Sequence, residues 1–456
     1  MPASQERSTF TRVLIRRLCL VTAMAGIILT SGGKAQTVNT QPFLDKKATK
    51  ILVDTLAWQL RKYYVFKDAA TRMGAYIQKR CKEGYYNTIS DPHVLAGQLT
   101  KDVSSVHLDE HFHVEYNPEA ARELAGEIED VPRFVEDKLN KEREKNFGFK
   151  KVEILNGNIA YLEISTFSRL NAYSKKTADA ALELISNSSA LIIDLRYGTG
   201  GSLDMVNHIM SKFFSTRTHI TDIYLRSEND TLHYWTQPDS MPGRLCQIPV
   251  YILTSYKTFS AAEALTYGLQ SLKRATVVGE VTRGGAHTVK YRNLSSGFIS
   301  DIPFGVARSP VTKTNWEKIG ITPDVMVNEE NAPETAEKLI FENAFLKCQD
   351  SLMKKKLRWE YDLLESNNHP YPMDTAMLRK FSGNYGPYTV YFKENCLYYQ
   401  KVGKAVFPLM PLNANTMKVK GNDSFRIEFI AGNNGLYTSI ITHYDDGRKE
   451  VARRSP

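Results

Sequence analysis

Residues 248–280 read IPVYILTSYKTFSAAEALTYGLQSLKRATVVGE, a pattern that predicts a strand, a helix and a second strand. The apolar run at residues 248–253 is typical of a buried strand, and a short polar loop leads from it to Ser260. Small and apolar residues then recur at helical spacing before the second apolar run, ATVVGE. Strands that alternate with helices favour an α/β core with a largely parallel sheet.

Ser260 has two interpretations at this stage. Serine is a favoured N-cap and Glu263 follows three residues later, so SAAE fits a capping box. Alternatively, the free N–H groups and positive dipole end of a helix N-terminus suit a nucleophilic serine, with the amide of Ala261 beside it to stabilise an oxyanion.

The same alternation extends toward the N-terminus. Two apolar runs around Asn156-Gly157 predict a hairpin, VEILNGNIAYLEI. They are followed by a helical pattern (ADAALELIS), a buried strand (ALIIDLR) and another helical pattern (SLDMVNHIMSKFF). The predicted fold class is therefore α/β.

The flanking regions have a different character. Residues 46–66 predict a helix with Ile51, Leu52, Leu56, Leu60 and Tyr64 near one face, and DPHVLAGQLTKDVSSV predicts another, headed by Asp91. Residues 131–148 predict a solvated helix, and residues 338–365 predict one long charged helix. After NNHPYPMD, alternating aromatic and β-branched runs predict a small antiparallel β domain.

These patterns divide the chain of 456 residues into five parts. They are a signal peptide (1–35), a helical N-terminal domain (36–116), a charged helical linker (117–150), the core with its closing helix (151–368) and the β domain (369–456). The signal peptide is predicted from a basic segment ending LIRR, the apolar run LCLVTAMAGIILT and small residues up to Ala35. A membrane anchor is the alternative, but this apolar run is short of the roughly 20 residues that span a bilayer.

Charge and cysteine content exclude several classes of protein. The net charge of +9 falls to about +5 without the first 35 residues, too mild to indicate a nucleic-acid partner. Cys81, Cys246, Cys348 and Cys396 show neither a C-x-x-C pair nor zinc spacing, and we expect them to be buried. The signal-peptide pattern of residues 1–35 predicts an exported protein, periplasmic or extracellular, with no stable membrane span.

A second motif narrows the interpretation of Ser260. In LIIDLRYGTGGSLD, a strand ends in the glycines Gly198, Gly200 and Gly201, where backbone amides can approach a ligand closely. A dinucleotide loop is the alternative, but the G-x-G-x-x-G spacing is absent.

Three ordered motifs resemble those of the S41 serine peptidases, the carboxyl-terminal processing and tricorn-like family. DLRYGTGG is similar to the family's DLRxNxGG, TSYKTFSAAEALTYGLQSLKRATVVGEVTRGGAH to its nucleophile segment in the interphotoreceptor-retinoid-binding-protein-like branch, and WEKIGITPDV to its closing motif. The chain departs from the family at Gly198, where asparagine is usual. The resemblance implies a crotonase-like ββα core, with serine peptidase activity on a peptide or protein substrate.

The resemblance also implies the catalytic residues. Processing peptidases of the family pair their serine with a lysine about 25 residues onward, but that position is Gly285 here. The tricorn-like branch uses Ser, His and Glu instead, which implies Ser260 as nucleophile, His111 of VHLDEHFHVEY as base and Glu317 as the acid that orients it. The amides of Gly200, Gly201 and Ala261 would form the oxyanion hole.

Alternatives remain for each of these residues. His107 and His113 flank His111 and suggest a metal site, His287 is a rival base or a substrate-binding residue, and Glu317 alone could be a surface carboxylate. The proposed chemistry requires no metal or organic cofactor. A second hypothesis is a non-catalytic binding protein for apolar ligands, because the retinoid-binding relatives carry the same fold.

Overall fold

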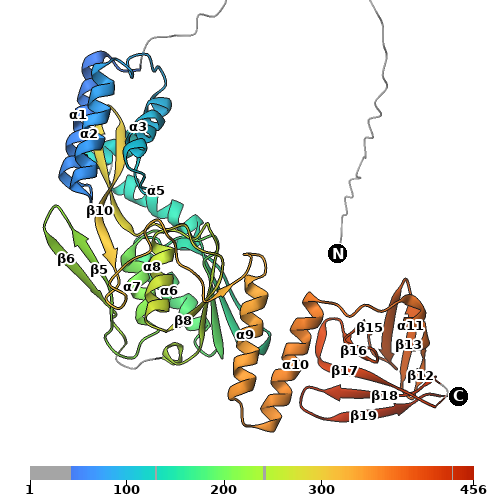
Figure 1. Cartoon of the computed structure of the whole chain (residues 1–456). Coiled ribbons are helices and arrows are strands. Elements are labelled where there is room, and N and C mark those ends of the chain that lie inside the picture. Colours follow the sequence, from blue (N-terminus) through green and yellow to red (C-terminus); the bar gives the residue numbers. More distant parts are fainter. Residues whose placement is uncertain (1–42, 129–130, 240–242, 434, 456) are drawn as a thin grey trace, which may run out of the picture. The chain divides into compact units, whose positions relative to one another are not determined.

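The computed structural model describes residues 43–128, 131–239, 243–433 and 435–455. Its α-helices, labelled in part in Figure 1, are α1 (Lys46–Tyr63), α2 (Lys67–Lys82), α3 (Pro92–Val106), α4 (Pro118–Ala125), α5 (Val131–Glu144), α6 (Ala172–Leu184), α7 (Leu203–Ser211), α8 (Ala261–Ser271), α9 (Ala332–Lys347), α10 (Ser351–Asn368) and α11 (Thr375–Lys380). The short 3-10 turns are η1 (Asn146–Gly148), η2 (Asn156–Asn158) and η3 (Arg244–Cys246).

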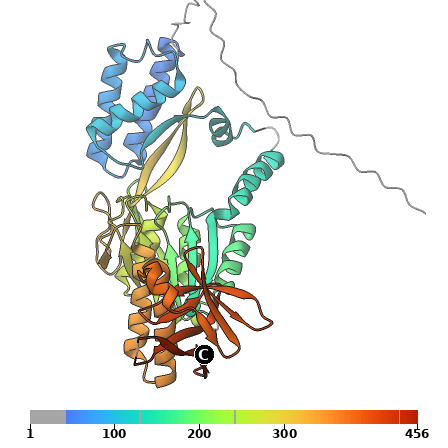
Figure 2. The same cartoon turned by 90° about the vertical axis from the view of Figure 1, so that its right-hand side faces the viewer.

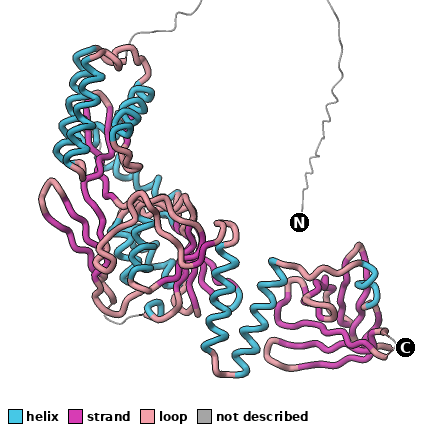
Figure 3. Tube along the Cα trace, viewed as in Figure 1, coloured by secondary structure: helices cyan, strands magenta, loops and turns pink. Residues whose placement is uncertain are grey.

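The strands fall into three sheets, drawn in magenta in Figure 3. The first six-stranded sheet has β2 (Phe149–Leu155), β3 (Ile159–Ile164), β4 (Ala190–Asp194), β7 (Val250–Thr254), β8 (Ala275–Gly279) and β11 (Val325–Met326). The second has β1 (His113–Tyr116), β5 (His219–Leu225), β6 (Asp230–Trp235), β9 (His287–Ser295) and β10 (Phe298–Arg308). The third has β12 (Gly383–Tyr385), β13 (Tyr388–Lys393), β14 (Cys396–Lys401), β15 (Val406–Pro411), β16 (Thr416–Val419), β17 (Asn422–Ala431), β18 (Tyr437–Tyr444) and β19 (Lys449–Arg453).

The six-stranded sheet confirms the predicted α/β core. Its order is β11-β8-β7-β4-β3-β2, parallel except for the β2–β3 hairpin predicted at Asn156-Gly157. All five residues of β4 and of β7 are buried, because both faces of this sheet are covered. Apolar residues of α6, α7 and α8 form one core with the sheet, and this core fixes the carboxyl ends of β4 and β7 side by side.

The N-terminal helices share a core with a distant part of the chain. Leu52, Leu56 and Leu60 of α1 pack in one cluster with Phe298 and Ile302 of β10, although about 240 positions separate them. Both Figure 1 and Figure 2 show these helices beside the β9–β10 hairpin. The predicted helical domain therefore obtains part of its core from residues beyond 287.

Two predictions about helices are wrong in detail. Ile51 was predicted on the buried face of α1 but is half exposed. The buried face is centred on Leu52, Leu56 and Leu60, and Ile51 lies at its edge. The single charged helix at residues 338–365 is two helices, α9 and α10. The break follows from Asp350, whose side chain accepts a hydrogen bond from Met353 N and caps a new helix.

The C-terminal strands form an antiparallel meander from β12 to β19, as the alternating pattern predicts. A bridge between Tyr385 and Arg454 brings the first and last strands together, so the sheet is nearly closed around an aromatic core. The expectation of buried cysteines is wrong: the four cysteines of the described chain are free, and each is at least partly exposed. Their spacing carried no signal of burial.

The structure does not test the predicted signal peptide or the predicted domain limits. The predicted signal peptide lies outside the described residues, and the limits proposed for the domains stay predictions. Among the helices that the structure describes, none combines the length and apolarity needed to cross a bilayer.

Candidate active site

Ser260 stands at the turn between β7 and α8, in an unusual backbone conformation. Its φ of 56° and ψ of −116° lie where a residue with a side chain is rarely found. Two hydrogen bonds hold the loop in place: Phe259 N donates to Gly198 O, and Thr258 Oγ1 donates to Leu195 O. Such strain persists only where surrounding contacts impose it, and it is common at functional sites.

Gly200 lies directly against Ser260. A Cβ at Gly200 would stand 2.8 Å from the Cβ and 3.3 Å from the Oγ of Ser260, and its φ of 109° also favours glycine. The neighbouring Gly201 bridges to Phe167, a pairing that uses Gly200 O and Ser202 N and leaves the Gly201 amide outside the ladder. The structure therefore brings the glycine turn and the start of α8 together at the serine.

Glu263 organises the serine and the segment facing it. Its buried carboxylate accepts hydrogen bonds from Ser260 N at 2.8 Å, Gly284 N at 2.7 Å, Gly285 N at 2.8 Å and Thr282 Oγ1 at 2.5 Å. Burial raises the pKa of Glu263, and these hydrogen bonds act in the opposite direction. The sequence indicated only the contact with Ser260, through the capping-box spacing.

His111 reaches Ser260 from the loop after α3. Its Nε2 lies 3.0 Å from Ser260 Oγ, and its ring stacks on Phe259 with the centroids 4.6 Å apart. The loop is tied to the core by an ion pair between Glu110 and Arg283. The two residues that sequence motifs singled out as nucleophile and base thus lie within hydrogen-bond distance.

The charge state of His111 suits a proton acceptor. Burial lowers its pKa to about 4, and this effect outweighs the opposing charge of Asp109. The imidazole is therefore neutral at neutral pH. Its other nitrogen, Nδ1, has no hydrogen-bond partner among the described residues.

Gly285, the position of the lysine in processing peptidases, lies against the His111 ring. A Cβ there would stand 2.6 Å from His111 Cε1 and would also overlap the ring of Phe259. No side chain fits at this position while His111 occupies its place. Histidine and a lysine at residue 285 are therefore mutually exclusive in this geometry.

Glu317 does not contact His111, which corrects its predicted role as the acid that orients the base. Its carboxylate instead accepts a hydrogen bond from Ala286 N at 2.7 Å and lies 3.7 Å from His287 Nδ1. His287, the first residue of β9, lies between Glu317 and Asp109 of the loop that carries His111, with its Nδ1 near both carboxylates. Burial raises the pKa of Glu317, opposed by the neighbouring His287.

The carboxylate nearest to His111 in its own loop is Asp109. Its Oδ1 accepts the backbone amide of His111 at 3.1 Å, while Oδ2 accepts bonds from His287 Nδ1 at 2.8 Å and the Tyr64 hydroxyl at 3.0 Å. Burial opposes ionisation of Asp109, but the hydrogen bonds from His287 and the His111 amide outweigh it and lower the pKa. In the sequence, Asp109 stands out only as part of VHLDEHFHVEY, and nothing there indicated its contacts with His111, His287 and Tyr64.

The structure does not bring His107, His111 and His113 together around a common point. His107 Nε2 contacts Lys318 Nζ at 3.4 Å, and His113 Nδ1 lies 3.4 Å from a carboxylate oxygen of Asp301. The hypothesis of a metal site at these three histidines is therefore wrong.

A cavity of about 290 Å³ opens beside Ser260. Its wall is largely apolar, and the side chains that form it include Leu203, Ile223, Tyr234, Phe304 and Trp316. Gly201, Ala261 and His287 also line this cavity, so the predicted oxyanion amides and the rival histidine face the same space as the serine.

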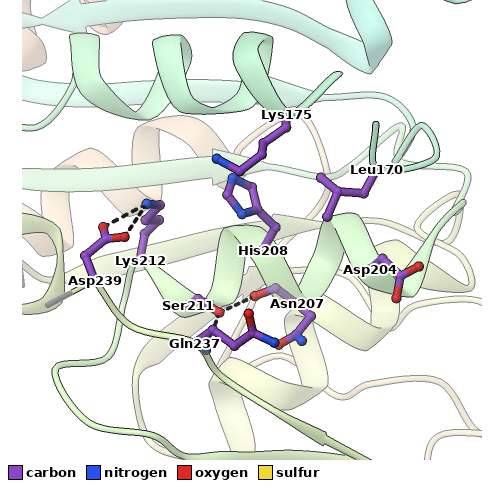
Figure 4. Close-up of a pocket in the computed structure, with 9 residues that line it drawn as sticks. All are labelled: Leu170, Lys175, Asp204, Asn207, His208, Ser211, Lys212, Gln237 and Asp239. Atoms are coloured by element: carbon purple, nitrogen blue, oxygen red, sulfur yellow. Dashed lines mark hydrogen bonds and ion pairs between the residues drawn. The ribbon is translucent and has the colours of Figure 1, made fainter. Parts of the chain in front are cut away.

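A second cavity, of about 400 Å³, is polar and shares Asp204 with the first (Figure 4). Two of its charged residues pair with each other: Lys212 Nζ lies 3.0 and 2.7 Å from the two carboxylate oxygens of Asp239. His208 Nε2 lies 2.7 Å from an oxygen of Asp179. Among the residues that line this cavity, no nucleophile is aligned with a base, so the apolar cavity beside Ser260 is the better candidate for an active site.

Two family models and several curated proteins are similar to this chain. Residues 158–327 match the model of peptidase family S41, and residues 44–150 match the model described as the N-terminal domain of Peptidase_S41 in eukaryotic IRBP. The chain is 30% identical over 169 residues to carboxyl-terminal-processing peptidase 2, chloroplastic, of Arabidopsis thaliana, covering 36% of this chain and 31% of that protein. It is 28% identical over 185 residues to the carboxy-terminal-processing protease of Bartonella bacilliformis, covering 39% and 40%.

The chain thus matches less than half the length of these relatives. A solved structure of a lipoprotein from Streptococcus agalactiae is similar with a TM-score of 0.47 and 14% identity, over 65% of this chain and 97% of that chain. The two family models cover consecutive regions that together include both Ser260 and His111. The chain belongs to peptidase family S41.

Proposed function

We propose that this chain is an exported serine peptidase that hydrolyses peptide or protein substrates through an acyl-enzyme at Ser260. The observation that carries the proposal is the 3.0 Å separation between His111 Nε2 and Ser260 Oγ. Membership of a peptidase family and the apolar cavity beside the serine support it. Export to the periplasm or the cell exterior rests on the pattern of residues 1–35 alone.

In the proposed mechanism, Ser260 Oγ attacks the substrate carbonyl carbon while His111 Nε2 takes its proton. The amides of Gly200, Gly201 and Ala261 stabilise the oxyanion that forms. His111 then delivers the proton to the departing amine, and a water molecule releases the acyl group by the reverse sequence. No metal or organic cofactor enters these steps.

The carboxylates of Asp109 and Glu317 do not bind the imidazole nitrogens of His111 and act on it indirectly. Asp109 holds the backbone of His111, and its negative charge favours the imidazolium that forms during the reaction. Glu317 holds the backbone of Ala286 and lies near His287. It therefore acts through residues of the cavity wall and not directly on the base. His287 then has a supporting role instead of that of the base.

The alternative is a non-catalytic carrier for apolar ligands, and the apolar lining of the cavity favours it. Mass spectrometry after treatment with a fluorophosphonate separates the two functions. We expect the wild type to gain one phosphonyl group on the peptide containing Ser260, and the Ser260→Ala variant to gain none. A wild type that neither reacts nor hydrolyses any peptide of a random library would support the carrier.

A further inference from the structure

The hairpin of β5 and β6 carries a cluster of metal-ligating groups outside the candidate active site. His219 Nε2 lies 2.7 Å and His233 Nδ1 lies 2.5 Å from the same oxygen, Oδ1 of Asp222. One ligand atom from each of the three residues lies within 4.8 Å of the others. We propose that His219, Asp222 and His233 bind a zinc ion that clamps β6 to β5.

The backbone explains why these three side chains meet. Asp222 and His233 are direct cross-strand partners, so their side chains share one face of the hairpin. His219 is three positions before Asp222 and would lie on the opposite face of a regular strand. The register shifts between His219 and Thr221, where the extra residue Ile220 makes a bulge that restores His219 to the face of Asp222.

The ligand set fits zinc by chemistry and by size. Imidazole nitrogen and carboxylate oxygen bind Zn²⁺ at about 2.0–2.2 Å, and tetrahedral ligands at that radius stand about 3.4 Å apart. The two nitrogen–oxygen separations, 2.7 and 2.5 Å, need to lengthen by less than about 1 Å, which small side-chain rotations supply. A site with three protein ligands leaves one position for water, and the His233 side chain is 58% exposed, so that position is open to solvent.

The two arginines next to this cluster, Arg308 and Arg217, make their contacts elsewhere. Arg308 is the cross-strand neighbour of Asp222 on β10, but its Nε donates to Lys313 O. Arg217 lies over the ring of Trp235, against which His219 stacks on a 4.4 Å centroid distance.

Clamping would matter because β6 is an edge strand. The sheet order β1-β10-β5-β6 gives β6 a single partner, and its pairing with β5 is interrupted by the bulge. A ligand that binds only the paired form stabilises that form. On the opposite face of the same hairpin, Thr221, Ile223 and Tyr234 line the cavity beside Ser260, so zinc would fix one wall of it.

The test is calorimetric titration of the full chain with ZnCl₂, accompanied by hydrogen exchange of the peptides that cover residues 219–235. We expect one zinc per chain, no comparable heat with MgCl₂, and slower amide exchange in β6 when zinc is bound. The variants His233→Ala and Asp222→Asn should each weaken zinc binding by about tenfold or more, because even the loss of an outer partner has that effect on metal affinity.

His443→Ala is the matched control. His443 also pairs with a carboxylate across a strand, Glu428 at 2.7 Å, but it has no second histidine. We expect this variant to bind zinc as the wild type does. The proposal is overturned if wild-type binding is unchanged in His233→Ala, or if His287→Ala abolishes it, because zinc would then occupy the cluster of Asp109, His287 and Glu317.

Discussion

Ser260 and His111 lie 149 positions apart in the chain, and the loops that carry them are held by different kinds of contact. The nucleophile loop (residues 255–260) is fixed by hydrogen bonds within the core, from Phe259 N, Thr258 Oγ1 and the Glu263 carboxylate. The base loop (residues 107–112) is fixed by its own side chains, which bind residues that follow β8 in the chain. These contacts are the Glu110–Arg283 ion pair and the hydrogen bond between Asp109 and His287.

This difference separates formation of the nucleophile from its activation. The geometry of Ser260 follows from folding of the parallel sheet and α8, because each constraint on it comes from neighbouring core segments. Alignment of the base also requires docking of the N-terminal helices and their hairpin from β9 and β10. Damage to the nucleophile loop should therefore affect both stability and rate, and damage to the base loop should affect mainly rate.

The largest effect on this side of the comparison is expected for Gly200→Ala, in the glycine turn that lies against Ser260 of the nucleophile loop. The new methyl group would stand 2.8 Å from the Ser260 Cβ and would displace a predicted oxyanion donor. Loss of one such donor lowers kcat by about 10²–10³-fold, and we expect a fall of this size in peptide hydrolysis. Gly403→Ala is the control: its φ is also positive, at 70°, but nothing lies within 4 Å of the new Cβ, so the rate should not change.

Glu263→Gln should lower both stability and activity. The amide offers one acceptor oxygen in place of two, so it leaves buried donors among Ser260 N, Gly284 N and Gly285 N unsatisfied. We expect the free energy of unfolding in urea to fall by about 1–3 kcal/mol. The exposed Glu228→Gln should have no measurable effect; equal stability of the two variants would mean that Glu263 does not hold the loop.

The pH dependence reports the environment of His111. Because burial lowers its pKa to about 4, kcat/KM should stay level from pH 8 to about pH 5 and fall only near pH 4. The same shift makes the unfolded chain bind more protons between pH 6.5 and 4, so stability should also decrease as pH falls through that range. A decline of kcat/KM centred near 6.5, the ordinary value for histidine, would show that the base is solvated and the loop undocked.

The smallest effect is expected for Glu110→Gln in the base loop. The Glu110–Arg283 pair is partly exposed, so its loss should leave the free energy of unfolding within about 1 kcal/mol. We expect kcat to fall by less than about tenfold, and rising NaCl to bring the wild-type rate toward that of the variant. A loss of stability as large as that of Glu263→Gln would remove the contrast between the two loops.

The sequence predicted what each segment forms more reliably than what it meets. The strands, the α8 helix and the hairpin at Asn156-Gly157 follow from local periodicity, and Ser260 and His111 from family motifs. Glu317 was assigned the wrong neighbour because its environment depends on how β9 positions His287 between it and the base loop. Glu263 accepts four hydrogen bonds, and Gly285 lies against His111. Both features join segments that only the tertiary fold brings together.

The most direct test of the account is the rate at which a fluorophosphonate labels Ser260 in the wild type, His111→Ala and His287→Ala. This reaction needs the nucleophile and its base but no recognition of a peptide. If His111 activates Ser260, His111→Ala should label about 10²–10⁴-fold more slowly, and His287→Ala should stay within about tenfold of the wild type. A collapse of labelling in His287→Ala, with His111→Ala close to the wild type, would contradict the account and make His287 the base.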